Sequence, residues 1–345
     1  MLEDEENMSQ LTISVALCTC NGEKYLREQL ESIARQTCQP DELVVCDDAS
    51  TDRTIEIIRD FSETASFPVR LFVNEKRLGS GRNFERAIGL CQRDVIALSD
   101  QDDVWAMSKL DSVKSFFNCY PDTDALFTDA EIVDQALQPK GYRLWDAIKF
   151  SVKERREVED GDVIHTLLRH NVVTGATMAF RAELRPLVLP VPEGVVHDAW
   201  IALLAAVAGQ VRIISLPLIL YRQHNANQIG VTKFSLAERI LRPCEQRIRD
   251  ARAVLRMYES VPDRLRQLPA SEATPALLDD FFRKAGHIRV RIKVITREAG
   301  WLRSMAAEIM RGHYHRYSTG WWGVGNDLVR CRPSHPLVPG SRSDK

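Results

Sequence analysis

The chain has 345 residues, 44% of them hydrophobic and 27% charged, as in an ordinary soluble globular protein that can bury a sizeable core. Its formal net charge of −2 argues neither for nor against a polyanionic partner, and we expect no nucleic-acid partner. The longest apolar run, residues 199–209, is well short of the roughly 20 residues that a transmembrane helix needs, which excludes a membrane span there.

The N-terminus and the cysteines indicate a cytoplasmic location. Residues 3–6 are all acidic, so we expect residues 1–10 to form a disordered acidic segment rather than a signal peptide. The eight cysteines include no Cys-x-x-Cys pair, and Cys46 and Cys91 lie in or beside apolar runs. Free thiols in a reducing compartment are the better interpretation, with the protein cytoplasmic or at most peripheral at the inner face of the cell membrane.

The first hundred residues alternate short apolar runs with helical patterns. The apolar runs that predict strands lie at 11–19, 43–46, 69–73 and 95–98. The helical patterns lie at 25–33, at 54–61 and from 84 to about 91. This repeat predicts a parallel sheet flanked by helices. Because ligands bind beyond the carboxyl ends of such strands, the loops at 19–21, 47–48 and 100–103 should converge on one crevice.

A glycine-rich turn, Gly79-Ser80-Gly81, precedes the third helix. Its backbone N–H groups could bind phosphate, and Arg82 would add a fork of donors. An ordinary junction between a loop and a helix explains the turn equally well. It is not a dinucleotide-binding fingerprint, because the first turn of the chain lacks Gly-x-Gly-x-x-Gly.

Three carboxylates, Asp100, Asp102 and Asp103, follow the fourth strand within four residues. They would repel one another unless a cation or tight hydrogen bonding compensated their charges. Carboxylate oxygens suit Mg²⁺ or Mn²⁺, whose coordination is often completed by water and substrate phosphates. A divalent metal site is therefore the first interpretation, and a solvated acidic turn is the alternative.

The second half of the chain continues the sheet. Further helices are predicted at 109–120, 163–168 and 197–208, and further strands at 125–128, within 171–180 and at 211–220. Residues 137–159 have mixed charge and little periodicity, so we expect a mobile connection over the crevice. Pro217 should break the last strand, which leads into a polar loop at 221–230.

Asp198 lies near the start of the helix at 197–208, where a carboxylate is electrostatically favoured and tends to stay ionised. It could serve chemistry in the crevice or simply cap the helix, and its position alone leaves both interpretations open.

The character of the chain changes after about residue 232. Residues 233–345 show Arg-rich helical patterns without obvious strands, and residues 283–332 hold 11 Lys or Arg against 3 Asp or Glu. We therefore predict a domain at 11–232 and a helical C-terminal region at 233–345. The aromatic and basic residues at 314–317 and 321–322 are compatible with a lipid interface, while packing onto the region's own core is an equal alternative.

In these residues the chain resembles the family 2 glycosyltransferases of GT-A fold, and among them the rhamnosyltransferase-like enzymes of bacterial surface polysaccharide and O-antigen synthesis. The resemblance covers about residues 11–232. Its motifs occur in the family's order at 19–26, 47–52, 82–83, 100–105, 171–175, 197–200 and 221–224. The implied architecture is a mostly parallel α/β sheet flanked by helices, with a C-terminal helical appendage.

The resemblance implies a transferase that moves a sugar, with inversion and with a divalent metal, from a nucleotide diphosphate donor to a glycan or lipid-linked glycan acceptor. Asp198 matches the family's catalytic base. The implied donor-binding residues are Cys18, Thr19, Asn21, Glu23, Asp48, Arg82, Asp100 and Arg222. Asp102, Asp100 and His224 would hold the metal. Asp103, Trp105, His197 and Trp200 would lie on the acceptor side.

Within these assignments, Asp48 would hydrogen-bond the base of the nucleotide, and Arg222 and His224 would belong to a loop that closes over the diphosphate. Cys20 departs from the family, which usually carries an aromatic residue before the Asn of the first loop, so the stacking of the base is not implied. A divalent cation would neutralise charge on the leaving diphosphate, and the acceptor hydroxyl needs a carboxylate base.

Other functions fit parts of the sequence. The donor could be a UDP-hexose rather than TDP-rhamnose, since nothing in the sequence discriminates between sugar hydroxyls. Asp47 and Asp48 also resemble the acidic pair of a receiver domain, which would make the protein a phosphorylation-regulated binding module. That alternative needs only about 120 residues and leaves the second acidic motif unexplained. A catalytically silent scaffold is the remaining alternative.

Overall fold

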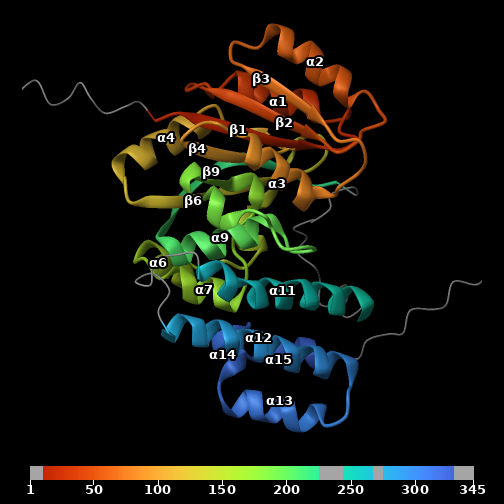
Figure 1. Cartoon of the computed structure of the whole chain (residues 1–345), viewed down its shortest axis with the longest axis vertical. Coiled ribbons are helices and arrows are strands. Elements are labelled where there is room, and N and C mark those ends of the chain that lie inside the picture. Colours follow the sequence, from red (N-terminus) through yellow and green to blue (C-terminus); the bar gives the residue numbers. More distant parts are fainter. Residues whose placement is uncertain (1–10, 225–243, 267–274, 330–345) are drawn as a thin grey trace, which may run out of the picture.

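The computed structural model describes residues 11–224, 244–266 and 275–329, and its centre is a nine-stranded sheet flanked by helices (Figure 1). The predicted acidic segment at 1–10 and the predicted boundary at 232 lie outside the described residues.

The first half of the sheet is parallel, as predicted. Its strands are β1 (Ile13–Thr19), β2 (Glu42–Asp47), β3 (Val69–Val73) and β4 (Val95–Asp100), in the order β3-β2-β1-β4. The helices between and after them are α1 (Leu26–Ala34), α2 (Thr54–Thr64), α3 (Ser80–Leu90) and α4 (Lys109–Cys119). Every residue of β1 and β2 is buried, which explains why these strands are continuous apolar runs instead of alternating patterns.

The second half of the sheet is mixed. It contains β5 (Val104–Trp105), β6 (Thr123–Val133), β7 (Pro139–Arg143), β8 (Met178–Arg181) and β9 (Gln210–Arg222). Strand β8 runs antiparallel to both β4 and β6, whereas β6 and β9 are parallel. Strand β5 pairs with β9, and β7 pairs with β6, both antiparallel. The helices here are α5 (Leu144–Ala147), α6 (Val152–Glu159), α7 (Val163–Arg169), α8 (Arg185–Val188) and α9 (His197–Ala208), with 3₁₀ turns at Gly175–Thr177 and Ala182–Leu184.

The prediction of a mobile connection at 137–159 is wrong, because this segment forms β7, α5 and α6. Trp145 and Phe150 are each 1% exposed, and Ser151 and Glu154 form a capping box at the start of α6. The apolar anchors are too few and too irregularly spaced to produce a periodic pattern. Burial of two large aromatic side chains nevertheless fixes the segment against the sheet.

The prediction that Pro217 breaks the last strand is also wrong, since β9 continues from Gln210 to Arg222. Pro217 lies where the pairing of β6 with β9 shifts register, between Thr128–Ile214 and Asp129–Pro217. A bulge of this kind accommodates a residue that has no N–H to donate.

The longest apolar run of the sequence is α9, most of which is buried. Its apolar residues occupy nearly the whole circumference because the helix is covered on nearly all sides by protein. Among the described residues, no helix combines the length and the apolar character needed to span a membrane.

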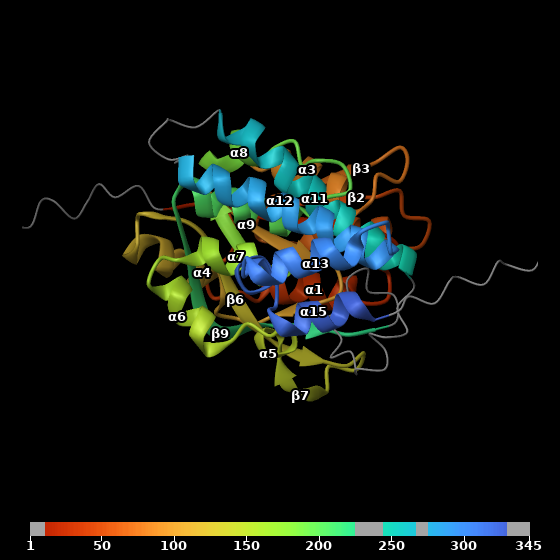
Figure 2. The same ribbon diagram turned by 90° about the horizontal axis from the view of Figure 1, so that it is seen from below.

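The C-terminal helices are α11 (Cys244–Leu265), α12 (Pro275–Thr296), α13 (Trp301–Met310), α14 (His313–Tyr317) and α15 (Trp321–Leu328). Helices α11 and α12 pack beneath α7 and α9, and α13 lies farthest from the sheet (Figures 1 and 2). Tyr258 of α11 is buried, and its hydroxyl donates to the carbonyl of Leu167 in α7 over 3.0 Å. The main hydrophobic core therefore extends into the C-terminal helices.

The aromatic residues predicted to face either lipid or the region's own core, at 314–317 and 321–322, divide into two groups. Tyr314 and Tyr317 are 1% and 0% exposed, so the packing alternative is correct for them. Trp321 and Trp322 are 66% and 44% exposed. The seven cysteines of the described residues are free thiols, as predicted.

Candidate functional site

The loops that follow β1, β2 and β4 lie together, as the parallel order of the strands requires. The Thr19 hydroxyl donates to the Asp47 carboxylate over 2.7 Å, which joins the first two loops. The Cys20 N–H donates to the Gln101 side-chain carbonyl over 2.8 Å, which joins the first loop to the acidic stretch. A Cβ on Gly22 would collide with the side-chain amide of Gln101, so a larger residue there would displace that amide from its bond with the Cys20 N–H.

The predicted donor-binding residues of the first loop differ in access. Cys18 and Thr19 are buried in β1, and burial raises the pKa of the Cys18 thiol well above its ordinary value. Asn21 and Glu23 are exposed, and each accepts a hydrogen bond from the second loop, Asn21 from the Thr51 N–H and Glu23 from the Arg53 N–H. These two side chains therefore brace the loop pair at the solvent edge.

Asp48 is 4% exposed and holds the turn that precedes α3. Its carboxylate accepts from the Asn74 amide over 2.8 Å and from the Leu78 and Gly79 N–H groups over 2.6 and 2.8 Å. A carboxylate offers about four acceptor positions, so little capacity is left for another donor. Its contact with a nucleotide base stays a prediction, and the observed bonds give it a role in fixing the glycine-rich turn.

Arg82 lies on α3, and its side chain is 44% exposed while it pairs with Glu85 over 2.7 Å. The pair joins residues of one helix three positions apart and is open to solvent, so it is weak and easily exchanged. The Arg82 guanidinium can therefore be drawn to another anion, and the predicted contact with a ribose or diphosphate stays a prediction.

The acidic stretch after β4 is partly withdrawn from water. Burial, with the charges of Asp102 and Asp198, raises the pKa of Asp100 to about 7. Burial likewise raises the pKa of Asp103, which is 1% exposed and accepts from the Arg222 N–H over 3.0 Å. The second oxygen of Asp103 has no hydrogen-bond partner among the described residues.

Lys109 is a cation buried beside these carboxylates, and the sequence reasoning missed it. It is 1% exposed, donates to the Ala176 carbonyl over 2.8 Å and lies 3.7 Å from the centre of the Trp105 ring. Burial lowers its pKa to about 7, against the opposing influence of Asp103 and Asp100. Its one signal in the sequence is a Lys at the start of a helix, where a cation is unfavourable for the helix dipole.

Arg222 is 1% exposed, and its side chain holds the acidic stretch in place. We call this side chain, with its contacts to Asp102, Gln135 and Glu28, the clasp. Its side chain donates to the Asp102 carbonyl over 2.8 Å and to the Gln135 carbonyl over 2.6 Å, and it pairs with Glu28. It also lies 4.6 Å from the centre of the Tyr25 ring. In this conformation Arg222 contacts protein groups, so its predicted contact with the diphosphate would require the clasp to open.

Two of the three predicted metal ligands contact each other. His224 Nε2 lies 2.8 Å from the Asp102 carboxylate, although the two residues are 122 positions apart in the chain. The charge of Asp102 also acts on Asp100, which places the third predicted ligand nearby. Within the described ranges, no group of three or more His, Cys, Asp or Glu side chains converges closely enough to hold a metal ion. A carboxylate and an imidazole already paired, with further carboxylates beside them, nevertheless fit the donor set of a divalent cation.

Asp198 is fixed at the start of α9. One carboxylate oxygen accepts from the Gly175 N–H over 2.8 Å, and the other accepts from the Ala199 N–H over 2.5 Å. The site is tight, because a Cβ on Gly175 would lie 2.9 Å from His197 Nε2. Asp198 is 8% exposed, which leaves its carboxylate a narrow opening to solvent.

The charges of four carboxylates act on one buried tyrosine, Tyr221. Burial raises the pKa of Tyr221 well above its ordinary value, and the charges of Asp103, Asp100, Asp102 and Asp198 raise it further. Tyr221 lies on β9, directly before Arg222. Strand β9 therefore brings together the acidic stretch after β4 and the start of α9.

The predicted acceptor-side residues are more buried than expected. Trp200 is 0% exposed and donates to the Val188 carbonyl over 2.8 Å, and Trp105 is 3% exposed. Both side chains pack in the core, and their acceptor-side role stays a prediction. His197 is 6% exposed, stacks on Phe84 with ring centres 4.1 Å apart and has no hydrogen-bond partner for either ring nitrogen within the part of the chain that the structure describes.

Comparison with known proteins relates the first half of the sheet and the acidic stretch to a sequence family. Residues 14–162 match the sequence model of Glycosyl transferase family 2. Over 113 residues the chain is 34% identical to the dTDP-rhamnosyl transferase RfbG of Shigella flexneri, which covers 30% of this chain and 39% of that protein. The chain covers 59% of the length of the curated relatives that it matches over 219 residues.

Two solved structures share the fold. S. aureus TarS 1–349 in complex with UDP-GlcNAc has a TM-score of 0.56 at 16% identity, covering 92% of this chain and 88% of that chain. The mannosyltransferase PcManGT from Pyrobaculum calidifontis in complex with GDP-Man and Mn²⁺ has a TM-score of 0.52 at 19% identity, covering 88% and 76%. The predicted GT-A type fold is confirmed, with a mixed sheet and added C-terminal helices.

Proposed function

Because residues 14–162 belong to glycosyl transferase family 2, we propose that this protein transfers a sugar from a nucleotide diphosphate donor to a hydroxyl group of a glycan or lipid-linked glycan. The observation that carries the proposal is that the charges of four carboxylates act on Tyr221 near the end of β9, where Asp103 accepts from the Arg222 N–H and Asp102 contacts His224. The family match weighs against a phosphorylation-regulated binding module, which would leave the second acidic motif without a role.

Asp198 is the proposed catalytic base, and the transfer is proposed to invert the configuration of the sugar. Its carboxylate is held by two backbone N–H groups, so it can take the proton of an acceptor hydroxyl without first reorienting. Direct inversion needs one base and no enzyme nucleophile. The bond from the sugar to the diphosphate breaks as the acceptor oxygen attacks, and the proton passes to Asp198.

Asp102 and His224, with Asp100 beside them, are the proposed ligands of Mg²⁺ or Mn²⁺. A divalent cation bound there would neutralise charge on the departing diphosphate. The contact between Asp102 and His224, and the presence of Mn²⁺ with GDP-Man in the structure of PcManGT, support this assignment. The buried Arg222 keeps the Asp102 backbone in place through its hydrogen bond to the Asp102 carbonyl.

The proposed donor is a TDP-deoxysugar such as TDP-rhamnose, used in the synthesis of a surface polysaccharide. The 34% identity with a dTDP-rhamnosyl transferase supports this choice. The likeness to TarS, solved with UDP-GlcNAc, keeps a UDP-hexose as the second candidate. Exposed Trp321 and Trp322 on α15 further support a peripheral contact with the membrane that would carry a lipid-linked acceptor.

Thermal-shift measurements with TDP, UDP and GDP, each with and without Mn²⁺, test donor and metal together. A selective nucleotide at about 100 times its Kd should raise the free energy of unfolding by about 2.7 kcal/mol. Turnover of the matching nucleotide sugar should require metal and should be lost in Asp102→Asn, which removes one ligand from a solvent-reachable crevice. Turnover that persists in excess chelator would contradict the metal assignment, and the absence of any stabilising nucleotide would contradict the donor class.

A further inference from the structure

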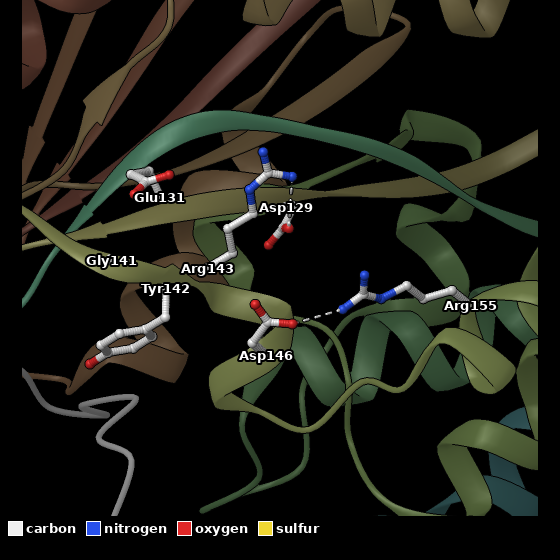
Figure 3. A pocket seen from close by; sticks show the side chains of 7 residues that line it. All are labelled: Asp129, Glu131, Gly141, Tyr142, Arg143, Asp146 and Arg155. Carbon is white, nitrogen blue, oxygen red and sulfur yellow. Dashed lines mark hydrogen bonds and ion pairs between the residues drawn. The ribbon is translucent and has the colours of Figure 1, made fainter.

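A polar hollow opens beside the proposed site, on the face formed by β6, β7, α5 and α6. It has a volume of about 490 Å³, within the roughly 300–1,000 Å³ range of ligand pockets. Its lining residues are Asp129, Glu131, Gly141, Tyr142, Arg143, Asp146 and Arg155 (Figure 3). The proposed donor and metal residues are not among them.

The hollow is built from fixed groups. Asp129 is 2% exposed, and one of its oxygens accepts from the Ala130 and Trp145 N–H groups over 2.9 and 3.1 Å. Arg155 donates to the Phe150 carbonyl over 3.0 Å and lies 5.0 Å from the centre of the Trp145 ring. The backbone and the aromatic core thus hold both an acceptor and a donor in position without help from a ligand.

The ion pairs of the hollow are loose. Arg143 lies 4.0 Å from Asp129, and Arg155 lies 3.4 Å from Asp146. Both pairs face the space between them in Figure 3, while Glu131 and Tyr142 lie at one side of it. Pairs of this length leave donor and acceptor capacity for a third group that can accept from a guanidinium and donate to a carboxylate.

The charged side chains that line the hollow indicate which class of ligand it can bind. Three carboxylates against two guanidinium groups disfavour a phosphate or a nucleotide, and the polar lining disfavours an apolar ligand. A hydroxyl group both donates and accepts, so neighbouring hydroxyls of a neutral sugar can bridge a carboxylate and a guanidinium.

The hollow is connected to the proposed site through Gln223, which follows the end of β9. The Tyr142 hydroxyl donates to the Gln223 side-chain carbonyl over 3.3 Å. Gln223 immediately precedes His224, which contacts Asp102, and its own N–H donates to the Val133 carbonyl of β6 over 2.9 Å. A residue that lines the hollow, Tyr142, therefore contacts the residue that immediately precedes the proposed metal ligand His224.

We propose that this hollow binds a neutral sugar residue of the acceptor glycan, with Asp146 and Arg155 as one group of contacts and Asp129, Glu131 and Arg143 as a second group. The inference rests on the proposed function for its meaning, because it names the class of acceptor. In this proposal the hollow recognises a sugar of the acceptor glycan that lies at a distance from the hydroxyl group that attacks the donor.

The test uses Asp146→Asn and Glu131→Gln in the full chain. The Asp146 side chain is 57% exposed and Glu131 is only partly buried, so neither change should prevent folding. With a donor that the enzyme accepts, and with methyl rhamnoside, methyl glucoside and methyl N-acetylglucosaminide as acceptor probes, each variant should raise the acceptor KM by about tenfold or more. The donor KM should stay unchanged. Glu63→Gln, an exposed carboxylate on α2, is the matched control.

Saturation-transfer NMR with the same three glycosides separates failure of this inference from failure of the proposed function. Binding of a glycoside by wild type that is lost in both variants supports the hollow even if no nucleotide sugar is turned over. No binding of any glycoside by wild type, binding that is unchanged in both variants, or acceptor KM values equal to those of wild type would overturn it.

Discussion

The region around the acidic stretch and the C-terminal helices each bury one lysine, and the two lysines have different surroundings. Lys109 is 1% exposed and Lys284 is 4% exposed. Burial lowers the pKa of each to about 7. Carboxylates oppose this shift at Lys109, whereas at Lys284 the charge of Arg291 adds to it.

The different surroundings of the two lysines indicate different roles: Lys109 belongs to the proposed site, and Lys284 belongs to the scaffold formed by the C-terminal helices. Lys109 lies among groups that would repel one another without a cation, and its bond to the Ala176 carbonyl reaches the turn whose Gly175 N–H binds Asp198. Lys284 donates to the Tyr317 carbonyl over 2.6 Å and lies 5.4 Å from the centre of the Tyr258 ring. We infer that Lys109 positions the two halves of the proposed site, while Lys284 only joins α12 to α14.

The largest effect is expected at Asp198, on the site side of this comparison. Asp198→Asn keeps the shape and can still cap α9, so a purely structural role predicts a loss of at most about 1 kcal/mol in stability and normal transfer. The proposed base role predicts transfer reduced by about 10²- to 10⁴-fold, with donor binding and Tm nearly unchanged. Transfer assays beside thermal melts decide between them. Near-normal transfer would leave the proton acceptor unassigned.

A smaller effect is expected when the two lysines are exchanged for methionine. Lys109→Met should reduce transfer by about 10²-fold, because the acidic stretch and the 175–177 turn lose their shared anchor and shift relative to each other. Lys284→Met should leave kcat and both KM values as in wild type, since its contacts lie in the C-terminal helices.

Donor affinity measured by thermal shift should fall in Lys109→Met and stay constant in Lys284→Met. Equal effects of the two substitutions on transfer would contradict the proposal that Lys109 positions the site while Lys284 only joins α12 to α14.

The pH dependence of stability sharpens the comparison further. The folded-state pKa of Lys284, about 7, is below the ordinary value of 10.5, so the unfolded chain binds more protons between those values. The contribution of Lys284 to the free energy of unfolding should therefore rise with pH from about 7 to about 10.5, by at most about 1.4 kcal/mol per pH unit. The free energy of unfolding of wild type and of Lys284→Met should be measured with denaturant at several pH values across this window. It should rise less steeply with pH in the variant than in wild type. Identical slopes would mean that Lys284 stays charged when buried.

The smallest effect is expected at the exposed apolar residues of the C-terminal helices. Leu302 and Trp321 are 63% and 66% exposed, in a region with an excess of basic residues. Leu302→Gln with Trp321→Gln should lower co-sedimentation with anionic vesicles a few-fold, and high salt should lower it in wild type. Leu216→Gln, 54% exposed on β9, is the matched control. Equal sedimentation of all three proteins would contradict the lipid contact.

Local sequence patterns are enough to predict most of the strands and helices, and the position of most loops that form the site. Strands such as β1 and β4 are buried on both faces, so most of their residues are apolar, and the polar Thr19 and Asp100 mark their ends. Because parallel strands end at one edge, the meeting of Thr19, Asp47 and Gln101 followed from the parallel order of the strands. The helix at 197–208 was also determined locally, by an apolar run that begins at a polar pair.

Only the tertiary structure decided which polar side chains serve the site and which serve the packing. The contact of Asp102 with His224, the clasp formed by Arg222 and the burial of Lys109 depend on where β9 lies beside β5 and β6. Segment 137–159 likewise takes its structure from two buried aromatic residues and not from any periodic pattern. Periodicity reports contacts between residues a few positions apart. These arrangements arise from contacts between residues much farther apart in the chain, such as Phe127 with Trp145 and Asp102 with His224, whose free energy is realised only when the chain has folded.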